Sequence, residues 1–372
     1  MGGQMKHYYK KDRNAKRLLV ISHGIGGGGA QKVTAMLSNG FSDRGYQVRI
    51  VTTSPSESIY EIRKEIEYMP VHARQKTSFM RTLYRIQVIR KNILDFKPDY
   101  ILSLSAIPNM LAIIARGCLK ADLIVSERTD PSRHPSGWLA AAVRNYLYRF
   151  PKAVVFQTES AKAYFHRNIQ KKGVVIPNAV LPDIPVSIEE KRRKKIAGMG
   201  ALTDQKDWMT GIRAFEMTVR KHPEYQLVIY GDGPERTRIE NYISRHKRLK
   251  DKVFLPGFAE DVLDKISDAE IFISSSAYDG ISNSILEAMA MGLPCVCTDA
   301  PAGGAGFLID DGRNGFLVPV GDYKKMHERI LRLIEDKDLA KRAGKKAMEV
   351  RKTYEYHHIL DRWEKTLLKK RG

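Results

Sequence analysis

Short apolar runs alternate with longer amphipathic stretches through most of this chain. Gly, Pro, Asn and Asp, which commonly mark the ends of strands, bound these runs. Such alternation is typical of βαβ units on a parallel sheet. It predicts strands at 17–23, 47–53, 99–105, 122–126, 153–157, 174–176, 195–199, 226–230, 252–255, 271–275, 294–298 and 315–318. Each half of the chain is therefore predicted to be an α/β domain with a doubly wound parallel sheet.

A segment of different composition separates the two halves. Residues 181–194 hold two prolines and a run of charged residues with few apolar side chains, which suits an exposed connector. We therefore predict a domain at 1–185 and a second at 186–353. Residues 354–372 are predicted to form a terminal helix that packs back toward the first domain, because apolar residues recur there at near-helical spacing.

The segment from 74 to 97 is predicted to be a basic amphipathic helix. Seven Arg and Lys residues are interleaved with apolar residues such as Phe79, Met80 and Leu83. This pattern is typical of helices that lie in a membrane interface. Alternatively, the apolar stripe packs on the domain core and only the charges face outward.

The formal net charge of +21 calls for an anionic partner. Such a charge attracts nucleic acid, anionic lipid or diphosphate substrates. Basic clusters lie at 6–17, 191–195 and 369–371, but no nucleic-acid-binding motif accompanies them. We therefore expect an anionic membrane surface and no nucleic acid, with a merely solvated basic surface as the alternative.

Other features of the sequence bear on location. The longest uncharged run, about residues 100–115, is shorter than the ~18 to 20 apolar residues of a membrane span, and no signal peptide is evident. The three cysteines, Cys118, Cys295 and Cys297, do not form a disulfide framework or a zinc motif. These observations predict a cytoplasmic protein, peripheral on the inner face of the cell membrane, with no metal site.

The first predicted strand runs into a glycine-rich loop at 24–29. Glycines at a strand-to-helix turn let a phosphate or sugar approach the backbone N–H groups. The loop lacks the Gly-Lys-Ser/Thr of a Walker motif, and the second strand lacks the acidic residue of a dinucleotide site. Gly28 and Gly29 are candidate donor-binding residues, and His23 is a candidate acceptor-binding residue. A plain turn and an ordinary histidine at a strand end are the alternatives.

The strongest signal lies between 275 and 294. A strand ends near Ser276, a loop carries Asp279, a Ser/Asn cluster begins a helix, and Gly292 with Pro294 ends it. Glu287 is thereby placed in the first turns of a helix at the carboxyl edge of a parallel sheet, where α/β proteins bind ligands. Its carboxylate can bind both hydroxyls of a ribose, or it merely complements the helix dipole. The residues expected to face a diphosphate are Ser282, Asn283 and Ser284.

At these residues the sequence resembles glycosyltransferase family 4. The family's acidic-x7-Glu motif is represented by Asp279 and Glu287, followed by Glu-Ala-Met-Ala-x-Gly-x-Pro. Further family motifs are matched in order by 28–33, 176–178, 200–206 and 231–234, so the resemblance covers nearly the whole chain. It implies the GT-B architecture, in which two Rossmann-like domains face a central cleft. It also implies metal-independent, retaining transfer of a sugar from a nucleotide diphosphate.

The resemblance assigns roles to individual residues. Glu287 would bind the donor ribose, Asp279 the transferred sugar, and Lys206 would neutralise the departing diphosphate, whose charge must be met by a cation. The remaining donor-binding residues would be Gly200, Gly231, Gly280 and Ile281. The expected donor is a UDP-hexose or UDP-N-acetylhexosamine, and the expected acceptor is a lipid-linked or cell-surface glycan.

The sequence departs from the family pattern at several positions. Asp279 stands where Glu is usual, and Ala201 stands where an Arg commonly holds the diphosphate, so Lys206 would carry more of that duty, with Arg213 or Arg313 as possible helpers.

The segment 126–129 resembles a variant found in members that build surface polysaccharides and lipid-linked oligosaccharides. In place of the family's usual His, Arg128 is a candidate catalytic residue, and Glu127 and His134 are candidate acceptor-binding residues. An exposed loop charge is the alternative for each. A sugar-nucleotide epimerase or hydrolase, and a basic nucleic-acid-binding protein, are the alternative functions.

Overall fold

A computed structural model of the chain describes residues 15–26, 28–55, 58 and 60–369. Most of the basic cluster expected at 6–17, and residues 370 and 371 of the last cluster, lie outside the described residues. Within the described ranges, 15–26 and 31–124 form one compact unit, and 28–30 with 125–369 form the other. None of the described helices is long and apolar enough to cross a membrane.

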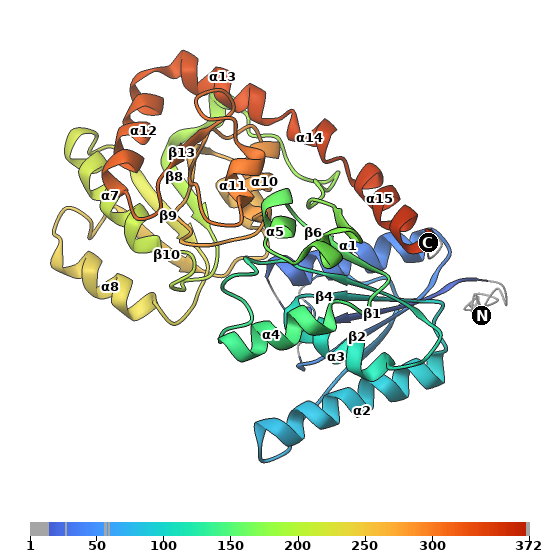
Figure 1. Cartoon of the computed structure of the whole chain (residues 1–372). Coiled ribbons are helices and arrows are strands. Elements are labelled where there is room, and N and C mark those ends of the chain that lie inside the picture. Colours follow the sequence, from blue (N-terminus) through green and yellow to red (C-terminus); the bar gives the residue numbers. More distant parts are fainter. Residues whose placement is uncertain (1–14, 27, 56–57, 59, 370–372) are drawn as a thin grey trace, which may run out of the picture. The chain divides into compact units, whose positions relative to one another are not determined.

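The first sheet has seven strands in the order β3-β2-β1-β4-β5-β6-β7 (Figure 1). β1 pairs in parallel with both β2 and β4, and its residues from Leu18 onward are buried. The strands are β1 (Arg17–Ser22), β2 (Gln47–Thr52), β3 (Glu67–Pro70), β4 (Tyr100–Leu104), β5 (Asp122–Ser126), β6 (Ala153–Phe156) and β7 (Gly173–Val175). The helices of this part are α1 (Gly29–Asp43), α2 (Ser78–Phe96), α3 (Ala106–Arg116), α4 (Trp138–Leu147), α5 (Glu159–Ala163) and α6 (Arg167–Gln170).

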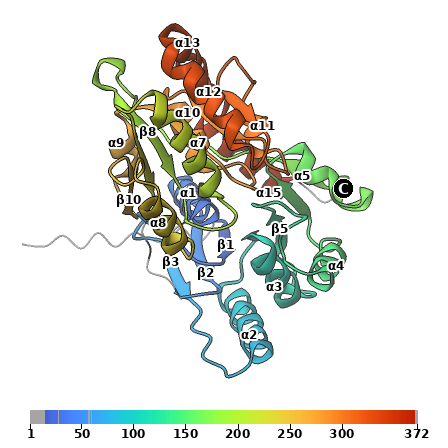
Figure 2. The same cartoon turned by 90° about the vertical axis from the view of Figure 1, so that its left-hand side faces the viewer.

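Helix α2 coincides with the predicted basic amphipathic helix. Thr77 caps its first turn by accepting a hydrogen bond from the N–H of Met80. Its C-terminal half packs on the core through buried Ile89, Ile93 and Phe96, whereas apolar side chains near its start are exposed. Figures 1 and 2 show this N-terminal end projecting away from the strands of its unit.

The second sheet has six strands in the order β10-β9-β8-β11-β12-β13. The strands are β8 (Arg193–Met199), β9 (Gln226–Tyr230), β10 (Val253–Gly257), β11 (Ala269–Ser274), β12 (Cys295–Thr298) and β13 (Phe316–Val318). The helices are α7 (Trp208–Lys221), α8 (Arg236–Arg245), α9 (Val262–Ile266), α10 (Asn283–Ala290), α11 (Gly304–Leu308), α12 (Tyr323–Glu335), α13 (Lys337–Ala347), α14 (Val350–Thr353) and α15 (Tyr356–Leu368), with a short 3-10 helix η1 (Glu189–Lys191).

Apolar clusters cover both faces of the second sheet. Adjacent residues of a strand point to opposite faces, so Ile271 joins one cluster and Phe272 the other. One cluster includes residues of α7, α8 and α12, and the other includes α10. Cys295 and Cys297 belong to the second cluster, and burial raises the pKa of both thiols. This sheet is therefore doubly wound, as predicted.

All twelve predicted strands are present, and their ends lie within two residues of the predicted ones. The sequence did not predict β3, because its four residues are only partly buried and Met69 is 45% exposed. Residues 176–192, between the two sheets, contain η1 as their only helix or strand, and the charged run ends inside β8. The terminal helix α15 lies in the second unit, where the Lys152 ammonium donates to the Leu367 carbonyl at 2.7 Å.

Candidate active site

Lys206 and Asp279 meet at the carboxyl edge of the second sheet. Their loops follow β8 and β11, which are neighbours in the sheet. The Lys206 Nζ lies 2.5 Å from Asp279 Oδ2, and both side chains are largely buried. Two hydrogen bonds join the loops, from the Ala277 N–H to the Gln205 carbonyl at 2.8 Å and from Ser275 Oγ to the Lys206 carbonyl at 3.0 Å. The fold therefore presents a fixed cation and carboxylate together.

Glu287 lies on α10, the helix that follows this loop. It is the fifth residue of the helix and is only 8% exposed. The dipole effect is strongest in the first turn and needs no burial, so it does not explain a buried carboxylate in the second turn. Burying a carboxylate is costly unless polar groups or a ligand satisfy it. The helix dipole alone therefore does not account for the burial of Glu287.

The serines before Glu287 differ from the expectation in one respect. Ser282 occupies the N-cap position of α10, but its hydroxyl makes no capping hydrogen bond. It lies instead 2.7 Å from the hydroxyl of Ser284. The Ser/Asn cluster therefore begins the helix as predicted, but without a side-chain cap.

Asn178 joins the end of the first sheet to the start of α10. Its amide nitrogen donates to the Ile281 carbonyl at 2.8 Å and to Asn283 Oδ1 at 2.5 Å. Its amide oxygen accepts from Gln157 Nε2 at 3.0 Å and from the Arg128 guanidinium. These buried groups follow β5, β6 and β7 and hold the loop that leads into Glu287. Sequence reasoning missed Gln157, although a polar residue directly after a strand is the signal that could have found it.

Arg128 is a buried guanidinium with spare hydrogen-bonding capacity. Its Nη2 donates to Asn178, but Nε and Nη1 are buried with no hydrogen-bond partner among the described residues. Burial lowers the pKa of this group to about 9. Because a buried unpaired donor is costly, two such donors beside the Ile281 loop suit an anionic or hydroxyl-bearing ligand. The alternative of an exposed loop charge is wrong for Arg128.

Glu127 and His134, the candidate acceptor-binding residues, have different hydrogen-bond partners from those of Arg128. Glu127 is buried, and it accepts a hydrogen bond from the Tyr148 hydroxyl. Burial raises its pKa to about 7, outweighing the opposing effects of Arg144 and Tyr148. The backbone carbonyl of His134 accepts from Arg144 Nη1 at 2.7 Å. The alternative of an exposed loop charge is wrong for Glu127 as well.

Two of the candidate glycines lie where neighbouring loops pack too closely to leave room for a side chain. A Cβ on Gly280 would lie 2.1 Å from Gln157 Oε1, and a Cβ on Gly231 would lie 2.0 Å from the carbonyl oxygen of Gly200. The carbonyl of Gly29 accepts from Asn283 Nδ2 at 3.1 Å, so the start of α1 is bonded to the start of α10. These glycines bring the candidate loops together, whatever they also contribute to a ligand.

The other candidates make contacts of their own. His23 is an exposed residue of the first unit, with its Nδ1 3.4 Å from Thr53 Oγ1. Arg213 stacks against Tyr242, and Arg313 forms an exposed ion pair with Asp310 at 3.2 Å. Neither arginine is bonded to Lys206 or Asp279 in the described structure.

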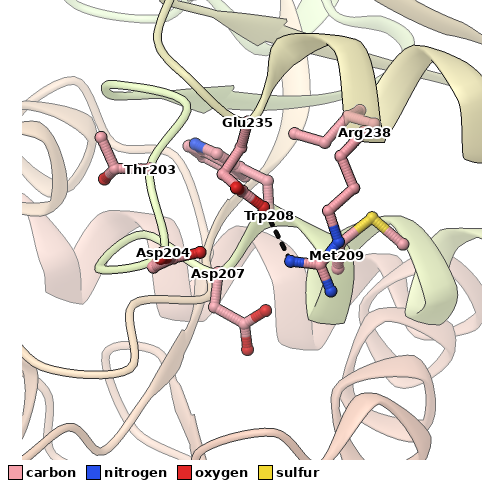
Figure 3. A pocket seen from close by; sticks show the side chains of 8 residues that line it. Thr203, Asp204, Asp207, Trp208, Met209, Glu235 and Arg238 are labelled. Carbon is pink, nitrogen blue, oxygen red and sulfur yellow. Dashed lines mark hydrogen bonds and ion pairs between the residues drawn. The ribbon is translucent and has the colours of Figure 1, made fainter.

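A small cavity borders the loop that carries Lys206. Its volume is about 50 Å³, and residues from the start of α7 and from α8 line it, including the ion pair of Glu235 with Arg238 (Figure 3). Lys206 and Asp279 do not line it, and it is too small for a nucleotide. Within the described ranges, no group of three or more His, Cys, Asp or Glu side chains is placed to hold a metal ion.

Two protein-family models match the chain and together span most of it. Residues 28–179 match the glycosyl transferase 4-like domain, and residues 193–336 match glycosyl transferases group 1. A Campylobacter jejuni relative, GalNAc-alpha-(1->4)-GalNAc-alpha-(1->3)-diNAcBac-PP-undecaprenol alpha-1,4-N-acetyl-D-galactosaminyltransferase, is 24% identical over 350 residues, 92% of this chain and 96% of the relative. A second from that organism, N-acetylgalactosamine-N,N'-diacetylbacillosaminyl-diphospho-undecaprenol 4-alpha-N-acetylgalactosaminyltransferase, is 26% identical over 363 residues, 91% of this chain and 96% of the relative.

The fold agrees with these matches. The crystal structure of Anabaena HepE in complex with UDP-glucose superposes with a TM-score of 0.82 at 17% identity, covering 94% of this chain and 99% of HepE. Two parallel sheets flanked by helices, matching such neighbours, define the chain as an α/β protein of GT-B type. The chain belongs to the group 1 and family 4-like glycosyltransferases, and it is a transferase. The resemblance stated from the sequence is confirmed.

Proposed function

We propose that this glycosyltransferase moves a hexose or N-acetylhexosamine from a UDP-sugar to a lipid-linked or cell-surface glycan, with retention at the anomeric carbon. The observation that carries the proposal is the meeting of Lys206 and Asp279 after neighbouring strands, where the loop of Asp279 is followed by the helix that holds the buried Glu287. The donor class is supported by the UDP-glucose bound to HepE. The acceptor class is supported by the undecaprenol diphosphate in the names of both Campylobacter relatives.

Each of the three residues has a distinct task in this proposal. Glu287 binds the hydroxyls of the donor ribose, and Asp279 binds the sugar that is transferred. Lys206 stabilises the diphosphate as the bond between the anomeric carbon and the β-phosphate oxygen breaks and the electron pair leaves with UDP. The acceptor hydroxyl bonds to the anomeric carbon, and its proton passes to the leaving diphosphate or to solvent.

The proposed reaction proceeds without a metal ion. A departing diphosphate needs positive charge, which metal-dependent enzymes supply with a cation. Here Lys206 supplies an ammonium group, and the buried Nε and Nη1 nitrogens of Arg128 can donate to an oxygen of the donor. These two side chains support metal-independent catalysis.

The proposed location is the cytoplasmic face of an anionic membrane. Residues 1–185 would receive the acceptor there, and residues 186–353 would bind the donor. Support comes from the net charge of +21 and from the exposed apolar residues at the start of the basic helix α2. A membrane surface is also where a lipid-linked acceptor resides.

The donor assignment can be tested with Glu287→Gln. This change keeps the shape of the side chain but removes charge-assisted hydrogen bonds worth roughly 1.5 to 3 kcal/mol. Calorimetry should therefore show UDP binding weakened by about ten- to a hundredfold. Glu328→Gln, an exposed residue of α12, is the matched control and should bind UDP normally.

Two results would contradict the proposal. The first is a Glu287→Gln variant that binds UDP as tightly as the parent and transfers sugar at the full rate. The second is a product whose anomeric configuration, read by NMR, is opposite to that of the donor.

A further inference from the structure

Helix α4 buries its charged residue and exposes its large apolar residues, whereas an ordinary surface helix does the opposite. Its charged residue, Arg144, is fully buried, and so is Tyr148 one turn later. Its exposed face is apolar and aromatic. The large exposed apolar residues, called the α4 face below, are Trp138, Leu139, Val143 and Tyr146 of the helix and Phe150 just after it. An ordinary surface helix buries its apolar side, so this exposed apolar face needs a partner.

The orientation of α4 is fixed by contacts on its buried side. The Arg144 guanidinium donates to the Pro131 and His134 carbonyls at 2.8 and 2.7 Å, and it stacks 4.7 Å from the ring of Phe165. The Tyr148 hydroxyl donates to Glu127. Turning the apolar residues inward would break these buried polar contacts, which is costly. The helix therefore holds its apolar face outward.

The charged residues in the sequence segment that holds the α4 face are all basic. From Pro131 to Thr158 the sequence contains no Asp or Glu. Arg133 and Arg149 are exposed, and Arg149 lies 5.6 Å from the ring of Tyr146. Trp and Tyr favour the membrane–water interface, and each basic residue near an anionic surface contributes about 1 kcal/mol. A second copy of this chain would instead set these arginines against one another.

We propose that the α4 face docks on an anionic lipid surface. It is a membrane contact separate from α2, and it deepens the proposed peripheral location without depending on any donor residue. The contact adjoins the candidate active site in the sequence, because the loop from β5 to α4 begins with Glu127 and Arg128. Glu127 is also bonded to Tyr148 at the end of α4. Lipid docking there places a membrane-held acceptor near this loop.

Tryptophan fluorescence can follow this contact directly. The chain has three tryptophans. Trp138 is 83% exposed, whereas Trp208 and Trp363 are 3% and 1% exposed. Vesicles of phosphatidylcholine with phosphatidylglycerol should shift the emission to the blue and protect it from acrylamide. The effect should grow with the phosphatidylglycerol fraction and weaken with salt. Trp138→Phe should abolish the shift while vesicle sedimentation persists.

Charge variants of the α4 face give the second measurement. Leu139→Glu with Val143→Glu should weaken sedimentation with anionic vesicles by about tenfold or more, because each side chain loses its apolar burial. Phe258→Glu is the matched control, since Phe258 is 60% exposed and lies outside α4, and it should sediment like the parent. UDP binding by every variant should match the parent, which separates this test from the donor assignment.

Three outcomes would overturn the proposal. Vesicle binding with no change in Trp138 emission would assign the lipid contact to another surface, such as α2. Undiminished binding by the double variant would do the same. A Trp138 shift that depends on protein concentration and not on lipid would assign the face to a second copy of the chain.

Discussion

At the scale of single residues, Glu127 links the pH of the medium to stability. Burial raises its pKa from 4.5 to about 7 in the folded chain, despite Arg144 and Tyr148, which act in the opposite direction. The folded chain therefore holds a proton between these pH values that the unfolded chain has released. The resulting stabilisation is complete below pH 4.5 and is lost as pH rises through about 7.

Glu127→Gln should remove this pH dependence, because the amide does not titrate. The free energy of unfolding of the parent, minus that of the variant, should fall by up to about 3 kcal/mol between pH ~5 and ~8. Denaturant unfolding of both proteins across this range gives the two free energies of unfolding. Subtracting one from the other cancels the contributions of the histidines, because both proteins contain them. Two stability curves that run parallel would show that Glu127 is ionised in the folded chain.

Lys206 should affect the rate of transfer more than the binding of donor. In the free enzyme Asp279 already balances its charge at 2.5 Å, whereas the charge on the diphosphate grows as the sugar leaves. Lys206→Ala should therefore lower kcat by about a hundredfold with a smaller rise in the donor KM. Lys265→Ala, which removes an exposed ammonium paired with Asp261, should leave both constants unchanged. An effect confined to KM would make Lys206 a binding residue only.

At the scale of elements, burial decides how much the sequence could predict. The central strands are buried on both faces, so they appear as continuous apolar runs, and each was predicted within two residues. Edge strand β3 has no such run, because it is only partly buried. Its four residues pair with β2 through the backbone, which leaves little mark on the sequence.

The residues of the candidate site also differ in how far the sequence could predict them. Lys206, Asp279 and Glu287 could be predicted because they stand in short motifs next to strand ends. Gln157 was missed although it directly follows a strand, because its role arises from contacts with Asn178 and Ile281, which are distant in the sequence. Likewise, nothing in the sequence of α4 identifies Arg144 as its buried residue, since the buried partners of that guanidinium come from the preceding loop and from Phe165.

Helix α2 resolves an alternative that the sequence left open. Its apolar stripe was expected either to pack on the core or to face a membrane. The structure divides these roles along the helix, with Ile89, Ile93 and Phe96 buried and Phe79, Met80 and Leu83 exposed. Its last turns therefore anchor the helix, and its first turns remain available as a surface.

At the scale of the whole molecule, the excess of basic residues predicts where the enzyme works. If α2 holds the acceptor half on an anionic bilayer, Phe79→Glu with Leu83→Glu should reduce transfer to a lipid-linked acceptor in anionic vesicles about tenfold. Transfer to a short water-soluble acceptor should be unchanged, because the change lies outside the candidate active site. Added salt should lower the rate on vesicles for the parent, since it screens the basic surface. Phe254→Glu on β10 is the control, as it places the same charge at another exposed aromatic residue. Equal activity of parent and double variant on vesicles, or a parent that is indifferent to lipid charge, would remove α2 from acceptor recognition.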